Sequence, residues 1–283
     1  MSTTIITSPQ NPRIKEAIKL RVRKGRDEQN RIIIDGVREI SLALKAGVQI
    51  VELYVLDGAE FDKPAAAVLE MARTARTPIM QVAAPVMAKL AYGDRIEGFV
   101  AVATPPAAQL EDFFSRIASP AHPPSDGGAA GAAPLVAVIE GAEKPGNVGA
   151  VLRTASAAGL SGVIVASGGT DLYNPNTIRA SLGAIFTTPV CATNSRAVLL
   201  ALRSRHFQML AARVDGAIGY LEANYLPPTA IILGSESRGL TEIWTGEELT
   251  SVRLPMLGAV DSLNVSVTAA VLFYEALRQR RIK

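Results

Sequence analysis

The chain has 283 residues, of which 48% are hydrophobic and 19% charged, and its formal net charge at pH 7 is +3. This length allows one large domain or two of medium size, and the apolar fraction is ample for a buried core. No apolar run approaches the roughly 20 residues of a membrane-spanning helix, and the N-terminus is too polar for a signal peptide. We therefore expect a globular cytoplasmic protein that has no membrane partner.

Cysteine and histidine are scarce in the chain. The single cysteine, Cys191, excludes an internal disulfide and any zinc site built from several cysteines. Only His122 and His206 remain as imidazole ligands, so we expect no metal site. Cys191 lies among apolar neighbours, and this position favours a buried structural thiol.

Helices and strands alternate through the first hundred residues, after a loose N-terminal arm. The expected helices are 11–24, 36–46 and 62–76, and the expected strands are 31–35, 50–56, 78–83 and 97–104. Such alternation indicates a compact three-layer α/β domain over residues 1–104.

Basic residues are concentrated near the N-terminus, where residues 13–31 carry far more Lys and Arg than Asp and Glu. The basic residues that we expect to contact RNA are Arg13, Lys15, Arg21, Arg23 and Lys24. A cluster of this kind attracts a polyanion. The alternative is a solvated helix face with no binding function.

Residues 105–133 are rich in Pro, Ala, Ser and Gly, with a brief amphipathic piece near residues 110–117. This composition predicts a flexible linker. Its last part, Ser119–Ala133, has too few large apolar side chains to pack against a domain.

Strands and helices alternate again in the second domain, residues 134–283. The expected strands are 135–140, 162–166, 207–213, 230–234 and 252–254, and the expected helices are 148–158, 176–186, 194–204 and a last one that begins at Asp261 or Ser262. The strands are almost continuously apolar, which indicates a parallel sheet covered on both faces. In the last helix we expect a buried stripe of Leu263, Val267, Ala270, Val271, Tyr274 and Leu277.

Two loops of this domain invite functions that their residues do not support. Gly141 and Gly146 have the spacing of a phosphate-binding loop, but Asn147-Val148 replaces its Lys-Ser/Thr pair. No G-x-G-x-x-G fingerprint of dinucleotide binding follows the strand either. Residues 235–239 are similar to a hydrolase nucleophile elbow, but Ser235 replaces its leading glycine. No histidine is placed to act as the base for a serine nucleophile.

Three segments carry the strongest functional signal. They are N-x-G-A-x-x-R-T-A at 147–155, G-S-E-x-x-G-L at 234–240 and L-P-M-x-G-x-x-x-S-L-N-V-S-V at 254–267. In this order they resemble motifs one, two and three of the SpoU/TrmH family of RNA ribose 2′-O-methyltransferases, of the SPOUT class. Residues 8–15 and 36–40 also resemble the N-terminal substrate-binding domain of many family members, which looks like a small RNA-binding ribosomal protein.

The resemblance implies a SPOUT α/β domain with a deep trefoil knot, S-adenosylmethionine as cofactor, RNA as substrate and a homodimer. It nominates one set of residues for the cofactor: Gly234, Leu254, Met256, Ser262, Leu263 and Asn264. It nominates a second set for catalysis: Asn147, Arg153, Glu236, Ser262 and Asn264. The chain departs from the family pattern at Lys144, where an acidic residue is common, and at Asp35 and Thr268.

Arg153 is the residue that we expect to clamp the RNA phosphate and orient the hydroxyl. An arginine in an apolar stripe needs a partner, and Glu236 is the expected one, although a purely structural ion pair is the alternative. We expect Asn147 to fix the loop or the ribose. Asn174 and Arg179 are further candidates for RNA contacts, with surface capping as the alternative.

The predicted function is S-adenosylmethionine-dependent methylation of a ribose 2′-hydroxyl in structured RNA, with ribosomal RNA favoured over tRNA. The alternative is a catalytically silent RNA-binding or ribosome-assembly protein that keeps the fold. A third hypothesis, methylation of a base, is disfavoured by the three motifs.

Overall fold

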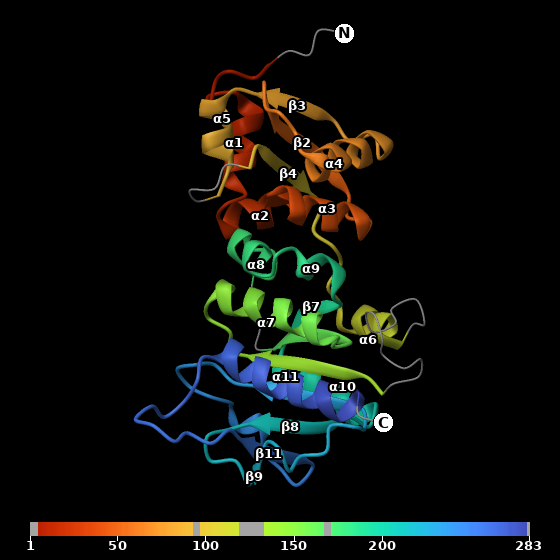
Figure 1. Ribbon diagram of the computed structural model, residues 1–283, viewed down its shortest axis with the longest axis vertical. Helices are drawn as coiled ribbons and strands as arrows, with labels where there is room; N and C mark the ends of the chain where they lie inside the picture. The colour runs from red at the N-terminus through yellow and green to blue at the C-terminus, as the bar shows by residue number, and fades with distance from the viewer. Residues whose placement is uncertain (1–4, 93–96, 119–132, 167–170, 282–283) are drawn as a thin grey trace. The chain divides into compact units, whose positions relative to one another are not determined.

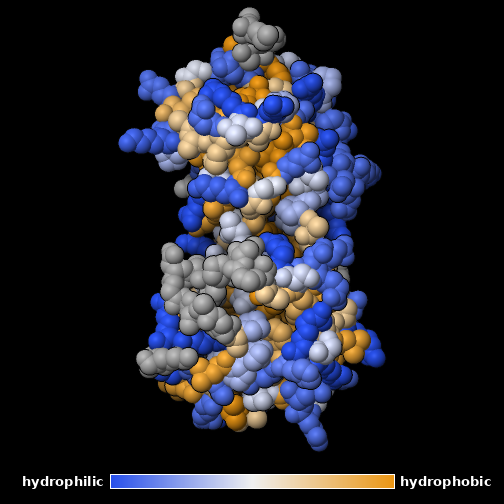
Figure 2. Space-filling view, turned by 90° about the vertical axis from the view of Figure 1, so that its right-hand side faces the viewer, coloured by the Kyte–Doolittle hydropathy of each residue, from blue (hydrophilic) through white to orange (hydrophobic). Residues whose placement is uncertain are grey.

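The computed structural model describes residues 5–92, 97–118, 133–166 and 171–281. The chain forms two compact units (Figure 1). The first unit comprises Met1–Pro106 together with Tyr173–Thr187, and the second comprises Ala107–Leu172 together with Thr188–Lys283. Figure 2 shows hydrophilic and hydrophobic side chains side by side on the viewed face.

The first unit is built on a four-stranded sheet in the order β1-β4-β2-β3. The strands are β1 (Ile32–Asp35), β2 (Ile50–Leu56), β3 (Ile79–Val82) and β4 (Phe99–Ala103), with β4 antiparallel to β1 and β2 and β3 parallel to β2. Helices α1 (Pro12–Lys19) and α5 (Ala84–Leu90) pack on one face, over Ile33, Tyr54 and Val100. Helices α3 (Val37–Lys45) and α4 (Lys63–Thr74) pack together on the other face.

The basic N-terminal segment differs from the prediction because it forms two helices. Helix α1 ends at Lys19 and α2 spans Arg23–Gln29. A Cβ atom on Gly25 would lie 2.6 Å from the carbonyl carbon of Lys19, so α2 turns back closely against the end of α1. Helix α5 was not predicted.

The predicted helix 176–186 is also two helices, α8 (Pro175–Ala180) and α9 (Ala184–Thr187), and both belong to the first unit. The helical conformation is interrupted between them at Leu182 and Gly183, which have φ values of 51° and 80°. A Cβ atom on Gly183 would lie 3.1 Å from the Cα atom of Glu39, so the break permits a close approach to α3. Sequence periodicity alone does not reveal this docking.

Part of the predicted linker is ordered structure in the second unit. Residues Leu110–Ala118 form helix α6, and its Phe113 and Phe114 side chains are 2% and 5% exposed in the core of that unit. Gly162 leaves room for them, because a Cβ atom there would lie 2.7 Å from the Phe113 ring. The boundary at residue 133 is therefore too late for the second domain. Residues 119–132 of the predicted linker lie outside the described residues.

The second unit contains a seven-stranded parallel sheet in the order β7-β6-β5-β10-β8-β11-β9. The strands are β5 (Leu135–Glu140), β6 (Gly162–Ala166), β7 (Val190–Thr193), β8 (Gln208–Ala212), β9 (Ile218–Gly219), β10 (Thr229–Leu233) and β11 (Leu249–Arg253). Strands β7 and β9 were not predicted. The predicted parallel sheet is confirmed.

Helices cover both faces of this sheet, as expected. Helix α7 (Pro145–Ala158) packs along α11 (Val265–Arg281) on one face. On the other face α6, α10 (Ser195–Ser204) and the short 3₁₀ helix at Glu242–Trp244 enclose the main apolar core. No helix of the described residues is long and apolar enough to cross a membrane.

The last helix begins later than predicted and buries a different face. Helix α11 starts at Val265, and its buried apolar residues are Val265, Ala269, Leu272, Phe273 and Ala276. In the stripe predicted to be buried, Leu263, Val267 and Tyr274 are 37%, 46% and 50% exposed. The prediction failed because apolar residues occupy more than one side of this helix, so periodicity does not single out one face.

Candidate active site

The three sequence motifs meet at one edge of the sheet in the second unit. Motif one follows β5, motif two follows β10 and motif three follows β11. These strands are parallel members of one sheet, so their carboxyl ends lie at the same edge, where open α/β sheets bind ligands. The geometry thus brings together residues that lie as far as 117 positions apart in the chain.

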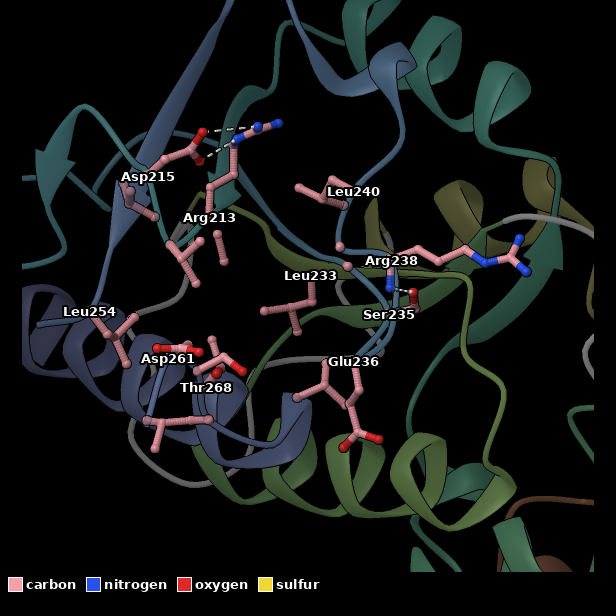
Figure 3. A pocket seen from close by; sticks show the side chains of 18 of the residues that line it. Arg213, Asp215, Leu233, Ser235, Glu236, Arg238, Leu240, Leu254, Asp261 and Thr268 are labelled. Carbon is pink, nitrogen blue, oxygen red and sulfur yellow. Dashed lines mark hydrogen bonds and ion pairs between the residues drawn. The ribbon is translucent and has the colours of Figure 1, made fainter. Parts of the chain in front are cut away.

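A cavity of about 530 Å³ lies at this edge (Figure 3). Among its lining residues are five that the sequence nominated for the cofactor: Gly234, Leu254, Met256, Ser262 and Leu263. The volume falls within the range of roughly 300–1,000 Å³ that is usual for small-molecule sites. We call it the first cavity.

Gly234 is required by the loop that follows it. A Cβ atom at this position would lie 2.6 Å from the backbone nitrogen of Leu240. The loop is closed by two backbone hydrogen bonds, Ser235 N–H to the Gly239 carbonyl at 3.1 Å and Gly239 N–H to the Ser235 carbonyl at 3.0 Å. The resemblance nominated Gly234 for the cofactor, and the close backbone contact that the structure shows at Gly234 is with Gly239 and Leu240 of the same loop.

Asn264 links the three motifs through its side-chain amide. Its Nδ2 donates to the Glu236 carboxylate of motif two and, at 3.5 Å, to Oδ1 of Asn147 in motif one. Its Oδ1 accepts from the backbone nitrogen and the hydroxyl of Ser266, at 2.9 and 2.6 Å. Asn264 therefore caps α11 and orients the catalytic candidates at the same time, and the helix does not begin at Asp261 or Ser262 as predicted.

Glu236 lies between the first cavity and a second one of about 250 Å³ that it also lines. Its other partner is Lys144, whose Nζ is 3.4 Å from Oε2 of the carboxylate. The second cavity is lined by Asn147 of motif one, by Ser237 of motif two, and by Glu143 and Lys144 of the loop that precedes motif one. The carboxylate of Glu236 is thus accessible from both sides.

Arg153 does not meet the expectation of an arginine in an apolar stripe. It is exposed on α7, whereas its neighbours Val151, Leu152 and Ala155 are buried. Within the described residues Glu236 pairs with Lys144 and Asn264 and not with Arg153. The expected Glu236–Arg153 ion pair is therefore wrong. Because Arg153 is exposed to solvent, its guanidinium does not need a carboxylate partner. The proposed clamp function of Arg153 stays a prediction.

Two polar features of the site were missed in the sequence. Glu140 is 2% exposed, and its carboxylate accepts from the Thr241 N–H at 2.8 Å, the Thr241 hydroxyl at 2.9 Å and the Ser195 hydroxyl at 2.5 Å. It thereby ties the end of β5 to the end of the motif-two loop. An acidic residue that ends an otherwise apolar strand is the signal that could have identified it.

The second missed feature is a bidentate ion pair that lines the first cavity (Figure 3). The Arg213 guanidinium donates to both carboxylate oxygens of Asp215, at 2.9 and 3.2 Å. These hydrogen bonds are the main reason why the pKa of Asp215 is lowered. The carboxylate therefore stays charged at a cavity that is lined by both polar and apolar side chains.

The residues predicted to contact RNA lie in the first unit and differ in exposure. Arg13, Lys15, Arg23 and Lys24 are exposed, and Arg23 and Lys24 face Asp27 and Glu28 at 3.4 and 3.7 Å. Arg21 is half-buried, and burial lowers its pKa. Its guanidinium donates to the carbonyl of Ala91, which indicates a structural function.

Arg179 and Asn174 also make structural contacts. Arg179 donates to the carbonyl of Tyr92, and the Asn174 side chain caps α8 by accepting from the Asn176 N–H at 2.9 Å. The capping that was the alternative for Asn174 is therefore present, and contacts of either residue with RNA stay predictions.

Metal-binding residues are not clustered in the part of the chain that the structure describes, where no group of three or more His, Cys, Asp and Glu could hold an ion. Cys191 is buried as predicted, and burial raises the pKa of its thiol to about 12. His122 lies outside the described residues.

Two family descriptions match the chain. The SpoU rRNA Methylase family matches residues 134–274, and the MRM3-like substrate binding domain matches residues 11–101. The 23S rRNA (guanosine-2′-O-)-methyltransferase RlmB of Bordetella pertussis is 32% identical over 235 residues, covering 82% of this chain and 90% of its own. The 23S rRNA (adenosine(1067)-2′-O)-methyltransferase of Streptomyces azureus is 26% identical over 96% of this chain and 95% of its own.

Solved structures match over nearly the whole chain. The crystal structure of an RNA 2′-O ribose methyltransferase is 41% identical, covers 98% of this chain and 99% of its own, and has a TM-score of 0.80. The SpoU methyltransferase AviRb from Streptomyces viridochromogenes, in complex with the cofactor AdoMet, is 28% identical, covers 96% of this chain and 98% of its own, and has a TM-score of 0.81.

Proposed function

Because the chain belongs to the SpoU rRNA methylase family, we propose that it methylates a ribose 2′-hydroxyl in ribosomal RNA. The chain is an RNA ribose 2′-O-methyltransferase with S-adenosylmethionine as its cofactor. The observation that carries the proposal is the network of Asn147, Glu236 and Asn264, which joins the three motifs beside the first cavity. Ribosomal RNA is favoured because the two relatives described above are named as methyltransferases of 23S rRNA.

The first cavity fits the cofactor in size and chemistry. Its apolar walls include Leu233, Leu254 and Leu263, which suit an adenine ring. Its carboxylates, Asp215 and Asp261, suit a ligand that carries a positive sulfonium and an ammonium group. When bound, the cofactor supplies an electrophilic methyl group. The protein has to hold the ribose hydroxyl in line with that group and accept its proton.

Glu236 and Asn147 are placed to orient the hydroxyl. Glu236 lines both cavities, so its carboxylate can accept a hydrogen bond from a hydroxyl group that enters through the second cavity. The Asn264 amide donates to the same carboxylate and keeps it in position. Asn147 lines the second cavity next to Glu236, with which it shares the Asn264 amide as donor, and it can bind the ribose. Ser262 lies in the first cavity, on the loop of motif three.

Arg153 is proposed to clamp an RNA phosphate and to assist removal of the proton. A free guanidinium keeps its proton far above neutral pH, so its deprotonation near neutral pH costs about 7 kcal/mol. A base function is therefore much less favourable than a clamp. The exposed position of Arg153 on α7 leaves its guanidinium open to an RNA chain.

The proposal includes a homodimer and a deep trefoil knot. Val267 and Tyr274 of α11 are 46% and 50% exposed on a helix that packs along α7, and a second copy of the chain would cover this apolar face. In support of the knot, β10 lies between β5 and β8, and the loops after β10 and β11 line one cavity. The proposed substrate implies a cytoplasmic location.

The test is transfer of a labelled methyl group. Purified protein, labelled S-adenosylmethionine and ribosomal RNA from a deletion strain should give one 2′-O-methylated nucleotide, at the position that loses its mark in that strain. The alternative of a catalytically silent RNA-binding protein predicts RNA binding without methyl transfer. Label in a base rather than in a ribose would contradict the proposed reaction.

A further inference from the structure

The second cavity is a separate polar compartment next to the first. Its walls carry the side chains of Glu143, Lys144, Asn147, Ser237 and Glu236. Its volume of about 250 Å³ lies below the range of roughly 300–1,000 Å³ for complete small-molecule sites. A compartment of this size and polarity suits a fragment of a larger ligand, such as one sugar and its phosphate.

Two contacts close the loop of motif one against that of motif two. The Ser237 hydroxyl donates to the Glu143 carboxylate at 3.0 Å, and Lys144 Nζ lies 3.4 Å from the Glu236 carboxylate. The lysine and glutamate side chains are 73% and 30% exposed. A long contact between partly exposed charges is weak, so a competing anion can displace the carboxylate from Lys144.

Lys144 differs in residue type and in position from the other basic residues of the second unit. It is the one lysine among the described residues of the second unit. It occupies the N-cap position of α7, whose first turn contains no acidic residue and whose N-terminus carries a partial positive charge. A lysine here is unfavourable for the helix. In the second cavity its ammonium group and the helix N-terminus are the positive groups, opposed by the carboxylates of Glu143 and Glu236.

We propose that Lys144 binds the phosphate of the target nucleotide in the second cavity and releases Glu236 when it does so. This inference rests on the proposed function and deepens it. In the free protein Lys144 neutralises Glu236. When RNA binds, the phosphate replaces the carboxylate as the partner of Lys144, and Glu236 keeps Asn264 as its donor. The released carboxylate oxygen then accepts the hydrogen bond of the ribose hydroxyl.

This exchange would couple RNA binding to the arrangement of the reacting groups. A carboxylate paired with an ammonium group is a weaker hydrogen-bond acceptor than one that has lost this partner. Glu236 therefore becomes a better acceptor only after a phosphate has occupied the neighbouring cavity. Lys144 has two linked functions, as a phosphate-binding residue and as a positioning residue for Glu236.

The experiment compares the full-length protein with Lys144→Met, Lys144→Arg and the control Arg203→Ala. Arg203 forms an ion pair with Glu248 and lines neither cavity, so its removal deletes one paired positive charge, as the removal of Lys144 does; its side chain is 43% exposed, against 73% for Lys144. RNA affinity is measured at several salt concentrations, cofactor affinity by calorimetry, and kcat and KM for RNA by methyl transfer.

Lys144→Met should weaken RNA binding on the order of tenfold and reduce the salt slope by about 0.7 for the loss of one phosphate contact. Lys144→Arg should restore both values, and Arg203→Ala should leave them unchanged, with cofactor affinity equal in all variants. A Lys144→Met protein with the wild-type salt slope and KM for RNA would overturn the proposal, even if its kcat changed. Because the salt slope needs no turnover, it remains decisive if the wild type transfers no methyl group, which would contradict the proposed function instead.

Discussion

Asn264 offers a direct test of how the three motifs are joined, because one substitution separates its two functions. In Asn264→Asp the remaining oxygen still accepts from the Ser266 backbone nitrogen, so the cap of α11 is kept. The donor to Glu236 and Asn147 is replaced by a second carboxylate oxygen. In Asn264→Ala the cap and the donor are both lost.

The expected magnitudes follow from these contacts. Asp and Asn are about equally good N-cap residues, whereas their replacement by Ala typically costs about 1 kcal/mol. Two carboxylates 4 Å apart repel by about 1 kcal/mol in water and by about 4 kcal/mol at an effective dielectric constant of 20. Glu236 is 30% exposed, so its environment lies between these limits and we expect about 2 kcal/mol for Asn264→Asp. The substitution that preserves the cap is therefore the more destabilising one.

Thermal unfolding at pH 8 measures this difference. For a domain of roughly 150–250 residues, 1 kcal/mol lowers Tm by about 2–4 °C, so we expect losses of about 4–8 °C for Asn264→Asp and about 2–4 °C for Asn264→Ala. The defect of Asn264→Asp should shrink towards pH 5, because protonation of one carboxyl group removes the repulsion, while that of Asn264→Ala should not. An Asn264→Asp protein as stable as the wild type at pH 8 would refute the contact between Asn264 and Glu236.

Three further predictions concern Gly234, Arg153 and the basic residues of the first unit. Gly234→Ala should lower cofactor affinity at least tenfold in a calorimetric titration, because the added Cβ atom collides with the backbone of its own loop; unchanged affinity would disprove this dependence. Arg153→Ala should abolish single-turnover methylation at saturating RNA with cofactor affinity nearly unchanged, and Arg153→Lys should keep little activity because one ammonium group does not reproduce the fork of a guanidinium; a wild-type rate would remove Arg153 from the mechanism. Charge reversal of Arg23 and Lys24 should weaken RNA binding and flatten its salt dependence while cofactor binding persists. Arg21 is not substituted because its guanidinium donates to the Ala91 carbonyl. Unchanged RNA affinity would mean that the basic cluster is only a solvated face.

The sequence by itself determined the class of fold and the identity of the segments that form the site. Nearly continuous apolar strands separated by helices predicted a parallel sheet with both faces covered, and the structure confirms it. The order and spacing of the three motifs indicated the family. Gly234, Leu254 and Leu263, chosen from those motifs, line one cavity. These features were accessible because they depend on local composition and on short spacings along the chain.

The tertiary structure alone decided which partners the site residues have. Sequence patterns placed Arg153 beside Glu236, but the structure gives Glu236 to Lys144 and Asn264. They also assigned residues 110–118 to a linker, although Phe113 of that segment is buried in the core of the second unit. Periodicity records that a side chain is apolar or charged and how it is spaced from its neighbours. Which distant surface covers it depends on strand order and helix packing, and these are set by contacts between residues far apart in the chain.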